Sequence, residues 1–274
     1  MKTKKALLLL SVFSTFFLTA CGQSSQNSKT IDQLIQTTEK LTSVHSIATN
    51  EVSYKTTKDA ETQKLTFTSD LTYIKSPYAI HLSGESTAFG NKNTQDLYVV
   101  DDSVYAKVNT STWLQYNIAE QVKKVKDKVD IPVGKELLEA ISSHKDKVKL
   151  EEKGDNYILT LSGLDDPLSP IIRNQLATTG NDTQFANLQF KDIVITLTFQ
   201  KKDQSILASK VTANLQLNGA GTATLDMNAT YTDFNQIKSI DLPEEAKDAP
   251  QAQPKKENTS SQEEHTSSEA ESAE

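Results

Sequence analysis

The residue types that most often perform chemistry are present in this sequence, but their spacing does not form a catalytic or metal site. The four histidines are far apart, and no two show the spacing of metal ligands; they are His45, His81, His144 and His265. Two carboxylate pairs, Asp101-Asp102 and Asp165-Asp166, could support acid–base chemistry if one member were buried. Both pairs lie in turn-like stretches, where Asp accepts backbone hydrogen bonds, and we interpret them as turn residues.

No signature of a common enzyme class occurs either. The sequence contains no nucleophile elbow, no phosphate-binding loop and no His-Glu-x-x-His helix. Gly219-Ala220-Gly221 lacks the third glycine of a dinucleotide fingerprint, and we interpret it as a hairpin turn. Asn91, Asn93 and Asp96 lack the glycine and the terminal glutamate of a calcium-binding EF-hand loop. We therefore expect a protein that is not an enzyme and that uses no metal and no cofactor.

The only cysteine, Cys21, stands where covalent lipid attachment would take place. A lysine-containing start and an apolar run over residues 7–18 precede it, which is the order of a secretory signal. The run is too short for a membrane-spanning helix, which needs about 20 apolar residues. The ending Leu18-Thr19-Ala20-Cys21 resembles the bacterial lipobox. This resemblance implies cleavage after Ala20 and a diacylglyceryl group on Cys21; the alternative is an ordinary signal peptide with a chance cysteine.

The expected anchor agrees with the physics of acyl chains and with the charge of the protein. Two acyl chains hold a protein firmly to a bilayer, whereas one binds reversibly. The chain has 36 acidic and 29 basic residues and a net charge of −7, and no basic stripe, so we expect no nucleic-acid partner. A single cysteine cannot form an internal disulfide, so the fold must depend on its core. We predict that the protein lies on the extracellular face of the bacterial cell membrane.

Composition divides the chain into four segments. Residues 1–20 are the predicted signal peptide, and residues 21–29 are a predicted flexible tether of polar residues. Residues 30–242 have the composition of one folded domain. Residues 243–274 contain few apolar side chains, too few to offset the entropy of ordering, and we predict a disordered acidic tail.

The folded segment shows helical and then strand periodicity. A helix is predicted to begin at Thr30, which forms a capping-box pattern with Gln33. Further helices are expected over residues 118–129, 137–141 and 166–176. Leu65, Phe67, Leu71 and Tyr73 alternate with polar residues, as in a half-buried antiparallel strand. A meander of three long strands is predicted at 193–199, 211–217 and 223–231.

About eleven strands and four helical segments result, in the order helix, strands, helices, strands. This order predicts an α+β domain with a single strongly curved antiparallel sheet, a half-open β-barrel, whose mouth a few short helices cover. The helices either fill the concavity or leave a groove, and the sequence leaves both possibilities open. Tyr98, Tyr105, Trp113 and Tyr116 form an aromatic group that would pack in the core or, alternatively, would form the wall of an apolar ligand groove.

The segment from Asp96 to Lys107, with Trp113 shortly after it, carries a resemblance to a known family. Together with the lipobox and the N-terminal helix, its pattern Tyr-x-x-Asp-x-x-x-Tyr resembles that of Gram-positive lipoproteins of the DUF6612 type. These are similar in architecture to the LolA/LolB carriers and the mycobacterial LppX/LprG lipoproteins. The resemblance covers roughly residues 30–242 and implies a half-open barrel; the carriers hold acyl chains in its cavity. No ligand-binding residue of the family is transferred to this sequence.

These observations lead to one functional prediction and one alternative. We predict a membrane-anchored extracytoplasmic lipoprotein that binds a lipid or another apolar ligand in a half-barrel cavity without catalysis. The alternative is a cell-envelope interaction protein with a filled core, which acts through its surface or its acidic tail. An apolar cavity of several hundred Å³ would favour the first.

Overall fold

The computed structural model describes residues 20–56, 62–88, 90–100, 103–116, 134–177, 189–217 and 221–252. Several sequence predictions lie outside these ranges. They are the signal peptide before Ala20, the turn at Asp101-Asp102, the helix expected over 118–129, the glycine turn before Gly221, and residues 253–274 with His265.

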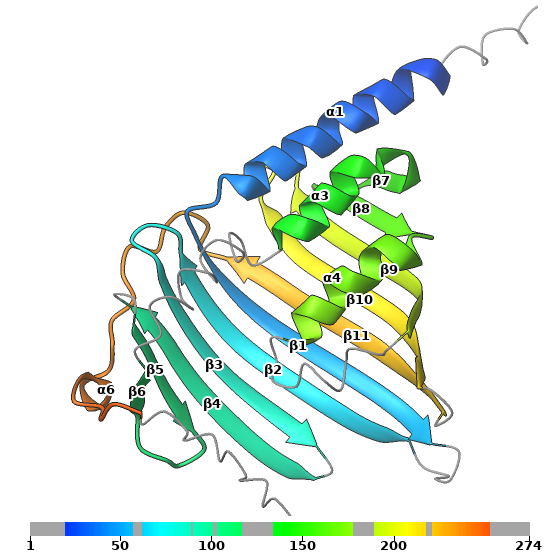
Figure 1. Ribbon diagram of the computed structural model, residues 1–274. Coiled ribbons are helices and arrows are strands. Elements are labelled where there is room, and N and C mark those ends of the chain that lie inside the picture. Colours follow the sequence, from blue (N-terminus) through cyan, green and yellow to red (C-terminus); the bar gives the residue numbers. More distant parts are fainter. Residues whose placement is uncertain are drawn as a thin grey trace, which may run out of the picture.

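Eleven strands form one antiparallel sheet in the described part of the chain (Figure 1). The first six are β1 (Ser43–Thr56), β2 (Gln63–Ile74), β3 (Ala79–Ala88), β4 (Asn91–Val100), β5 (Ser103–Val108) and β6 (Leu114–Tyr116). The other five are β7 (Val148–Lys153), β8 (Asn156–Ser162), β9 (Gln189–Gln200), β10 (Ile206–Leu217) and β11 (Gly221–Thr232). The fold class and the number of strands predicted from sequence are confirmed.

The strand order explains how one chain builds so wide a sheet. It runs β6-β5-β4-β3-β2-β1-β11-β10-β9-β8-β7, so two meanders meet where the first strand pairs with the last. β1 pairs with the whole length of β11, from His45 opposite Thr232 to Thr56 opposite Gly221. β6 and β7 are the two edges, and the sheet is not closed.

Three of the described helices cover one half of this sheet on one face. They are α1 (Ala20–Glu39), α3 (Lys135–Ser143) and α4 (Asp165–Ala177), with a short 3-10 turn at Lys145–Lys147. In Figure 1, α3 and α4 lie in front of β8 to β11, α1 lies across the upper end of these strands, and no labelled helix lies in front of β2 to β5. We call the face of the sheet that these helices cover the inner face, and the opposite one the outer face.

The main core fills the space between these helices and the inner face. Leu34 of α1, Ile141 of α3 and Leu168 of α4 are completely buried there. The strands contribute fully buried side chains at alternate positions, as period-two burial requires; they include Leu159, Leu161, Ile193, Ile195, Leu197 and Phe199. Burial of this much apolar surface is the main stabilising term of the fold.

The first helix begins ten residues earlier than the sequence predicted. α1 starts at Ala20, so the segment predicted as a tether is helical, and Thr30 is an interior residue rather than a cap. The Thr30 hydroxyl donates to the carbonyl oxygen of Gln26 at 3.1 Å, one turn earlier. Residues 23–29 contain neither glycine nor proline, so no residue type in this stretch interrupts the helix.

The described structure also continues beyond Leu242, where the sequence predicted the tail to begin. Helix α6 (Glu244–Lys247) places Ala246 in a small core with Tyr98 and Trp113, and Ala246 is completely buried. The Gln115 amide donates to the Pro250 carbonyl at 3.0 Å, and the Ala252 amide donates back to the Gln115 carbonyl at 2.8 Å. Residues 250–252 therefore cover the edge of β6.

Candidate functional site

Charged side chains are strictly segregated between the two faces of β1–β5. Within these described strands, every Asp, Glu, Lys and His lies on the outer face by its register; these are His45, Glu51, Lys55, Lys64, Asp70, His81, Glu85, Lys92, Asp96 and Lys107. The inner face of the same five strands carries only apolar side chains and uncharged polar ones. A sheet face without charged side chains can be covered by apolar groups without the cost of desolvating a charge.

An apolar strip lies on this inner face beyond the reach of the helices. We define the strip as Leu65, Phe67 and Leu71 of β2 with Leu82 of β3. Leu71 pairs with Leu82, and Leu82 pairs with Leu97 of β4. The strip residues are half-buried, and among the described residues they belong to none of the hydrophobic clusters. They are a continuation of the core face that the described helices do not cover.

Gly84 leaves room on the inner face for the Phe67 side chain of the strip. A Cβ at Gly84 would stand 3.1 Å from Cζ of Phe67 and 3.2 Å from Cγ of Gln95. The Phe67 ring and the Gln95 side chain therefore both rest on the glycine. This close approach requires the absence of a side chain, which is a common reason for glycine inside a strand.

The four aromatic residues predicted as a groove wall are not brought together on one surface. Tyr98 and Tyr105 are register partners on the outer face, and Trp113 packs edge-on to Tyr98 with ring centroids 5.7 Å apart. Tyr116 instead pairs with Val104 on the inner face and is 37% exposed. Three of the four therefore form an outer-face core with α6, and they do not line the inner face.

Burial and one neighbouring carboxylate affect the titration of Tyr98 in this outer-face core. Burial raises the pKa of Tyr98 above its ordinary value, and the nearby Asp96 carboxylate adds to the rise. His81 stacks on Tyr98 with centroids 4.2 Å apart, and its Nε2 lies 2.8 Å from Asp96 Oδ1. His81 therefore lies on the outer face of β3, opposite Tyr98.

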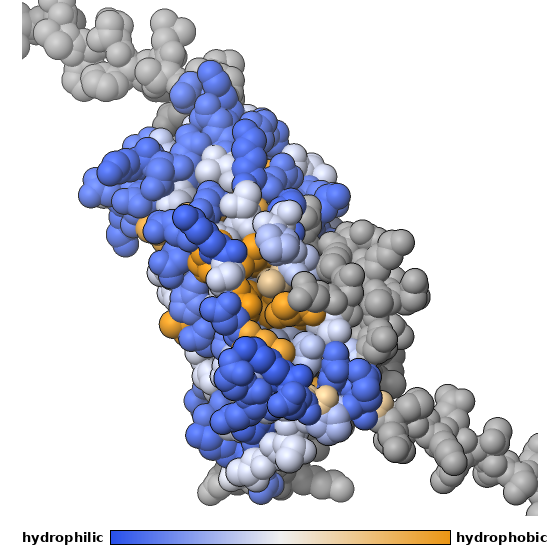
Figure 2. Space-filling model, turned by 90° about the vertical axis from the view of Figure 1, so that its left-hand side faces the viewer, coloured by the Kyte–Doolittle hydropathy of each residue, from blue (hydrophilic) through white to orange (hydrophobic). Residues whose placement is uncertain are grey.

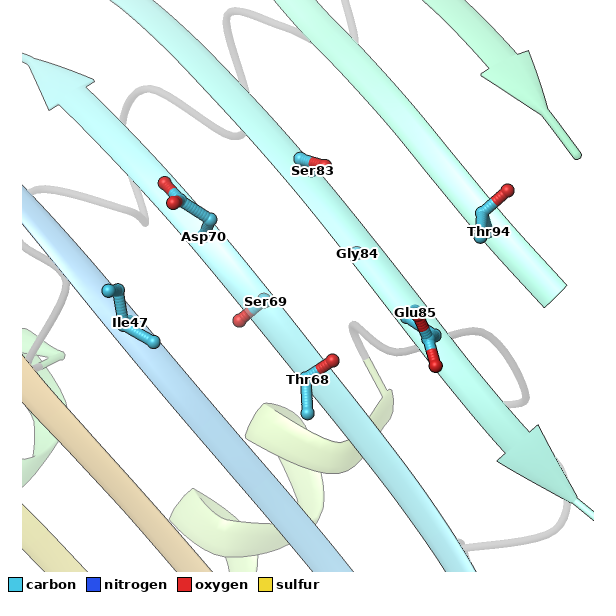
Figure 3. A pocket seen from close by; sticks show the side chains of 8 residues that line it. All are labelled: Ile47, Thr68, Ser69, Asp70, Ser83, Gly84, Glu85 and Thr94. Carbon is cyan, nitrogen blue, oxygen red and sulfur yellow. The ribbon is translucent and has the colours of Figure 1, made fainter. Parts of the chain in front are cut away.

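A shallow depression of about 330 Å³ lies on the outer face of β1–β4 (Figure 3). Its walls include Ile47, Asp70, Ser83 and Glu85, which come from three neighbouring strands. The carboxylates are engaged across strands: Asp70 lies 2.8 Å from His45, and Glu85 lies 2.6 Å from Lys92. A second hollow of similar volume lies between Asn27 of α1 and the β7–β8 hairpin. The residues that line both hollows are mostly polar.

Two further findings concern chemistry that the sequence analysis considered. Among the described residues, no group of three or more His, Cys, Asp or Glu side chains is placed to hold a metal ion. The Asp165 carboxylate accepts hydrogen bonds from the backbone amides of Asp192 and Ile193 at 3.0 and 2.9 Å. Asp165 is the first residue of α4 and supports a strand far along the chain, so its interpretation as a turn residue is wrong, although its carboxylate does accept backbone hydrogen bonds.

Hydropathy on the side of the molecule that carries β5, β6 and α6 is uneven. Figure 2 shows a hydrophobic band across the middle of this side, between hydrophilic areas above and below it. Val108 and Tyr116, at the ends of β5 and β6, are 54% and 37% exposed. In the part of the chain that the structure describes, no helix combines the length and the apolar character needed to cross a membrane.

Comparison with known proteins assigns this chain to a protein family. The model of a family described as "Family of unknown function (DUF6612)" matches residues 26–251. A search of curated proteins gave no match.

Solved structures give only a distant likeness. The ywiB protein from Bacillus subtilis is 6% identical, with 69% of this chain and 92% of that chain covered and a TM-score of 0.21. The LolA superfamily protein NE2245 from Nitrosomonas europaea is 9% identical, with 78% and 94% covered and a TM-score of 0.20. A DUF1329 family protein from Desulfovibrio piger is 11% identical, with 80% and 95% covered and a TM-score of 0.23. At TM-scores this low, the likeness carries no argument about this chain.

Proposed function

We infer a function for this chain, which belongs to the DUF6612 family of unknown function, from the distribution of charge and apolar surface over its sheet. The protein is a membrane-anchored extracytoplasmic protein that binds the apolar chain of a lipid or another apolar ligand on the inner face of β1–β5, without catalysis. The observation that carries this proposal is the charge-free inner face, on which the apolar strip is left half-buried.

The energetics favour an apolar ligand at this place. Covering half-buried leucine and phenylalanine side chains contributes about 25 cal/mol for each Å² of apolar surface removed from water. No charged group of β1–β5 would lose its hydration when the inner face is covered, so the desolvation of charge does not offset this gain. Water excluded from the outer face would instead leave many charged groups unsolvated, and the outer face is therefore the poorer candidate.

Anchoring through Cys21 supports the same role. Cys21 is the second residue of α1, a helix of 20 residues, which spans about 30 Å. Acyl chains on Cys21 hold the start of this helix at the bilayer surface, and the other end of the helix packs on the sheet. The sheet is thereby kept near a supply of lipid.

Native mass spectrometry tests the binding proposal directly. The mature chain with Cys21→Ser, purified from a lipid-containing host, is expected to carry a bound lipid mass that disappears on denaturation. A bare protein mass, together with no uptake of added fatty acid or monoacylglycerol, would overturn the proposal.

Paired substitutions in β3 locate the ligand. Leu82→Asp places a charge on the inner face and is expected to abolish the bound mass, whereas Ser83→Asp places the same charge on the outer face of the same strand and is expected to preserve it. Leu82→Ser, which adds no charge, is the milder variant if Leu82→Asp reduces folding. Equal lipid occupancy in all variants would exclude the inner face as the site.

Anchoring requires its own experiment. In the full chain, incorporation of a labelled fatty acid is expected to depend on Cys21 and to be lost in Cys21→Ser, with release of the protein from the membrane fraction. Labelling that persists in Cys21→Ser would contradict the proposed anchor.

A second candidate function has one supporting observation. Residues 250–252 are fixed to the β6 edge, so the described chain ends at a defined point of the sheet. An interaction protein of the cell envelope could present its acidic end there. Removal of residues 253–274 leaves the contacts of Ala246 and Gln251 in place; it would abolish partner binding on this alternative, and it would leave lipid binding intact on the first.

A further inference from the structure

The polar groups of the inner face differ from one strand to the next in a way that bears on the ligand. β2 stays apolar along most of its inner face, with Leu71, Phe67 and Leu65. β4 changes character halfway: Val99 and Leu97 are followed towards its start by Gln95, Asn93 and Asn91. We call these last three residues the amide row. It consists of uncharged groups that both donate and accept hydrogen bonds.

The register brings the amide row beside the apolar strip. Asn93 pairs with Ser86 of β3, and Ser86 pairs with Phe67 of β2. Gln95 pairs with Gly84, and its side chain lies over that glycine close to the Phe67 ring, as the distances of 3.2 and 3.1 Å to the same Cβ position indicate. An amphiphile lying across β2–β4 would therefore contact apolar side chains with its chain and amides with its polar end.

Charge decides which polar end fits. A carboxylate, phosphate or ammonium group brought beside the half-buried Gln95 would lose part of its hydration, and the inner face of β1–β5 offers it no side chain of opposite charge. Hydroxyl and amide groups need only hydrogen bonds, which the amide row can supply; within the row, Asn93 Oδ1 already accepts a hydrogen bond from Asn109 Nδ2 at 3.2 Å. The one carboxylate of β4, that of Asp96, is on the outer face and lies 2.8 Å from His81 Nε2.

We propose that the ligand of the inner face is an uncharged amphiphile, with its apolar chain on the strip of β2 and β3 and its hydroxyl- or amide-bearing head on the amide row of β4. This deepens the proposed function and rests on it. It excludes free fatty acids and anionic phospholipids as the preferred ligands.

A series of amphiphiles with one chain length and different heads tests the proposal. The probes are dodecyl maltoside, dodecanoate and dodecyltrimethylammonium, each titrated below its micelle-forming concentration into the mature Cys21→Ser protein and followed by native mass spectrometry and calorimetry. The maltoside is expected to bind at least about tenfold more tightly than either charged probe, because an unpaired charge costs more than the 1.4 kcal/mol that corresponds to tenfold.

Charge introduced at one position should reverse this preference. Gln95→Lys adds a cation on the inner face and is expected to tighten dodecanoate binding by about tenfold. Thr94→Lys adds the same charge to the outer face of β4 and is expected to leave the affinity for dodecanoate and for dodecyl maltoside unchanged. If Gln95→Lys folds poorly, Asn93→Lys offers the same test at an exposed position of the row.

The outcomes separate this inference from the proposed function. If no probe binds, the proposed function fails. If dodecanoate binds the unaltered protein as tightly as dodecyl maltoside, or if Gln95→Lys and Thr94→Lys have the same effect, the inner face binds apolar chains without regard to the head, and the uncharged-amphiphile proposal is overturned while the proposed function stands.

Discussion

At the scale of single residues, Asp165 illustrates how a carboxylate in this chain supports backbone geometry. It opens α4, and it accepts the amides of Asp192 and Ile193 in β9. Asp192 has a positive φ of 52°, and the pairing of β9 with β10 shifts register beside it, between Thr212 and Asn214. Such an irregularity leaves amides without ladder partners, and the Asp165 carboxylate provides the acceptors.

Removal of this carboxylate should destabilise the fold. Asp165→Ala is expected to lower the free energy of unfolding by about 2 kcal/mol, because two amides lose a charged acceptor. Urea denaturation measures the change. Asp166→Ala, at the exposed neighbouring position, is the control and should stay within about 0.5 kcal/mol of the unaltered protein. Equal effects of the two substitutions would contradict the role assigned to Asp165.

Tyr231 makes the stability sensitive to alkaline pH. Burial raises the pKa of Tyr231 above its ordinary value of 10.0, against the opposing effect of the Ser209 hydroxyl at 2.9 Å. Because the neutral phenol is favoured in the folded state, its contribution is complete below the unfolded-state pKa and is lost as the pH rises above it. Stability should therefore fall above pH 10, and Tyr231→Phe should show a shallower fall. Denaturation at pH 8 to 11 checks this; identical slopes would refute it.

At the scale of elements, α6 and residues 250–252 act as a cover over the outer side of β4–β6. Ala246 is completely buried against Tyr98 and Trp113, and Lys107 lies over the Trp113 ring at 5.8 Å. The edge strand β6 has only three residues, and an uncovered edge is prone to pair with other chains. The C-terminal segment satisfies this edge with two backbone hydrogen bonds.

Displacement of α6 should be visible through the only tryptophan. Ala246→Glu would bury a charge in the small core, so we expect α6 to leave its place and the emission of Trp113, now 6% exposed, to shift to longer wavelength. Lys247→Gln on the exposed side of the same helix should leave the spectrum unchanged. An unshifted spectrum in Ala246→Glu would show that α6 does not shield Trp113. Self-association measured by light scattering would further report exposure of the β6 edge.

Elements with strong periodicity could be predicted, and elements defined by distant contacts could not. The alternation of Leu65, Phe67, Leu71 and Tyr73 predicts β2 because period-two burial is local. From Gln23 to Lys29 the first half of α1 is polar, so no apolar stripe marks it as helical. α6 has four residues and is held by Trp113, which is far away in the sequence.

The candidate site was only partly predictable for a related reason. Tyr98, Tyr105 and Tyr116 were grouped by residue type, whereas the parity of their positions in paired strands decides which face each side chain occupies. The parity argument places Tyr116 opposite to the other two. The same argument, applied across β1–β5, reveals the charge-free inner face, but it needs the strand pairing that only the structure provides.

At the scale of the whole molecule, the two halves of the sheet differ in how much buried apolar core packs on their inner face. The halves meet where β1 pairs with β11, strands separated by most of the domain. Helices pack on β8–β11 and build the main core there, while β4 and β5 share only a small cluster of Val99 and Val104 on the inner face of the described structure. Local opening costs least where few buried apolar contacts must be broken.

Hydrogen exchange should therefore differ between the halves and should report the ligand. Amides of β9 and β10 are expected to exchange only through global unfolding, and amides of β4 and β5 faster, through local opening. An uncharged amphiphile on the inner face should slow exchange in β2–β4 by more than in β9 and β10, since it stabilises the state that it binds. Leu82→Asp should lose this selective protection, and Ser83→Asp should retain it. Uniform protection across all strands would contradict the unequal halves, and ligand-induced protection confined to β9 and β10 would place the ligand under the helices instead.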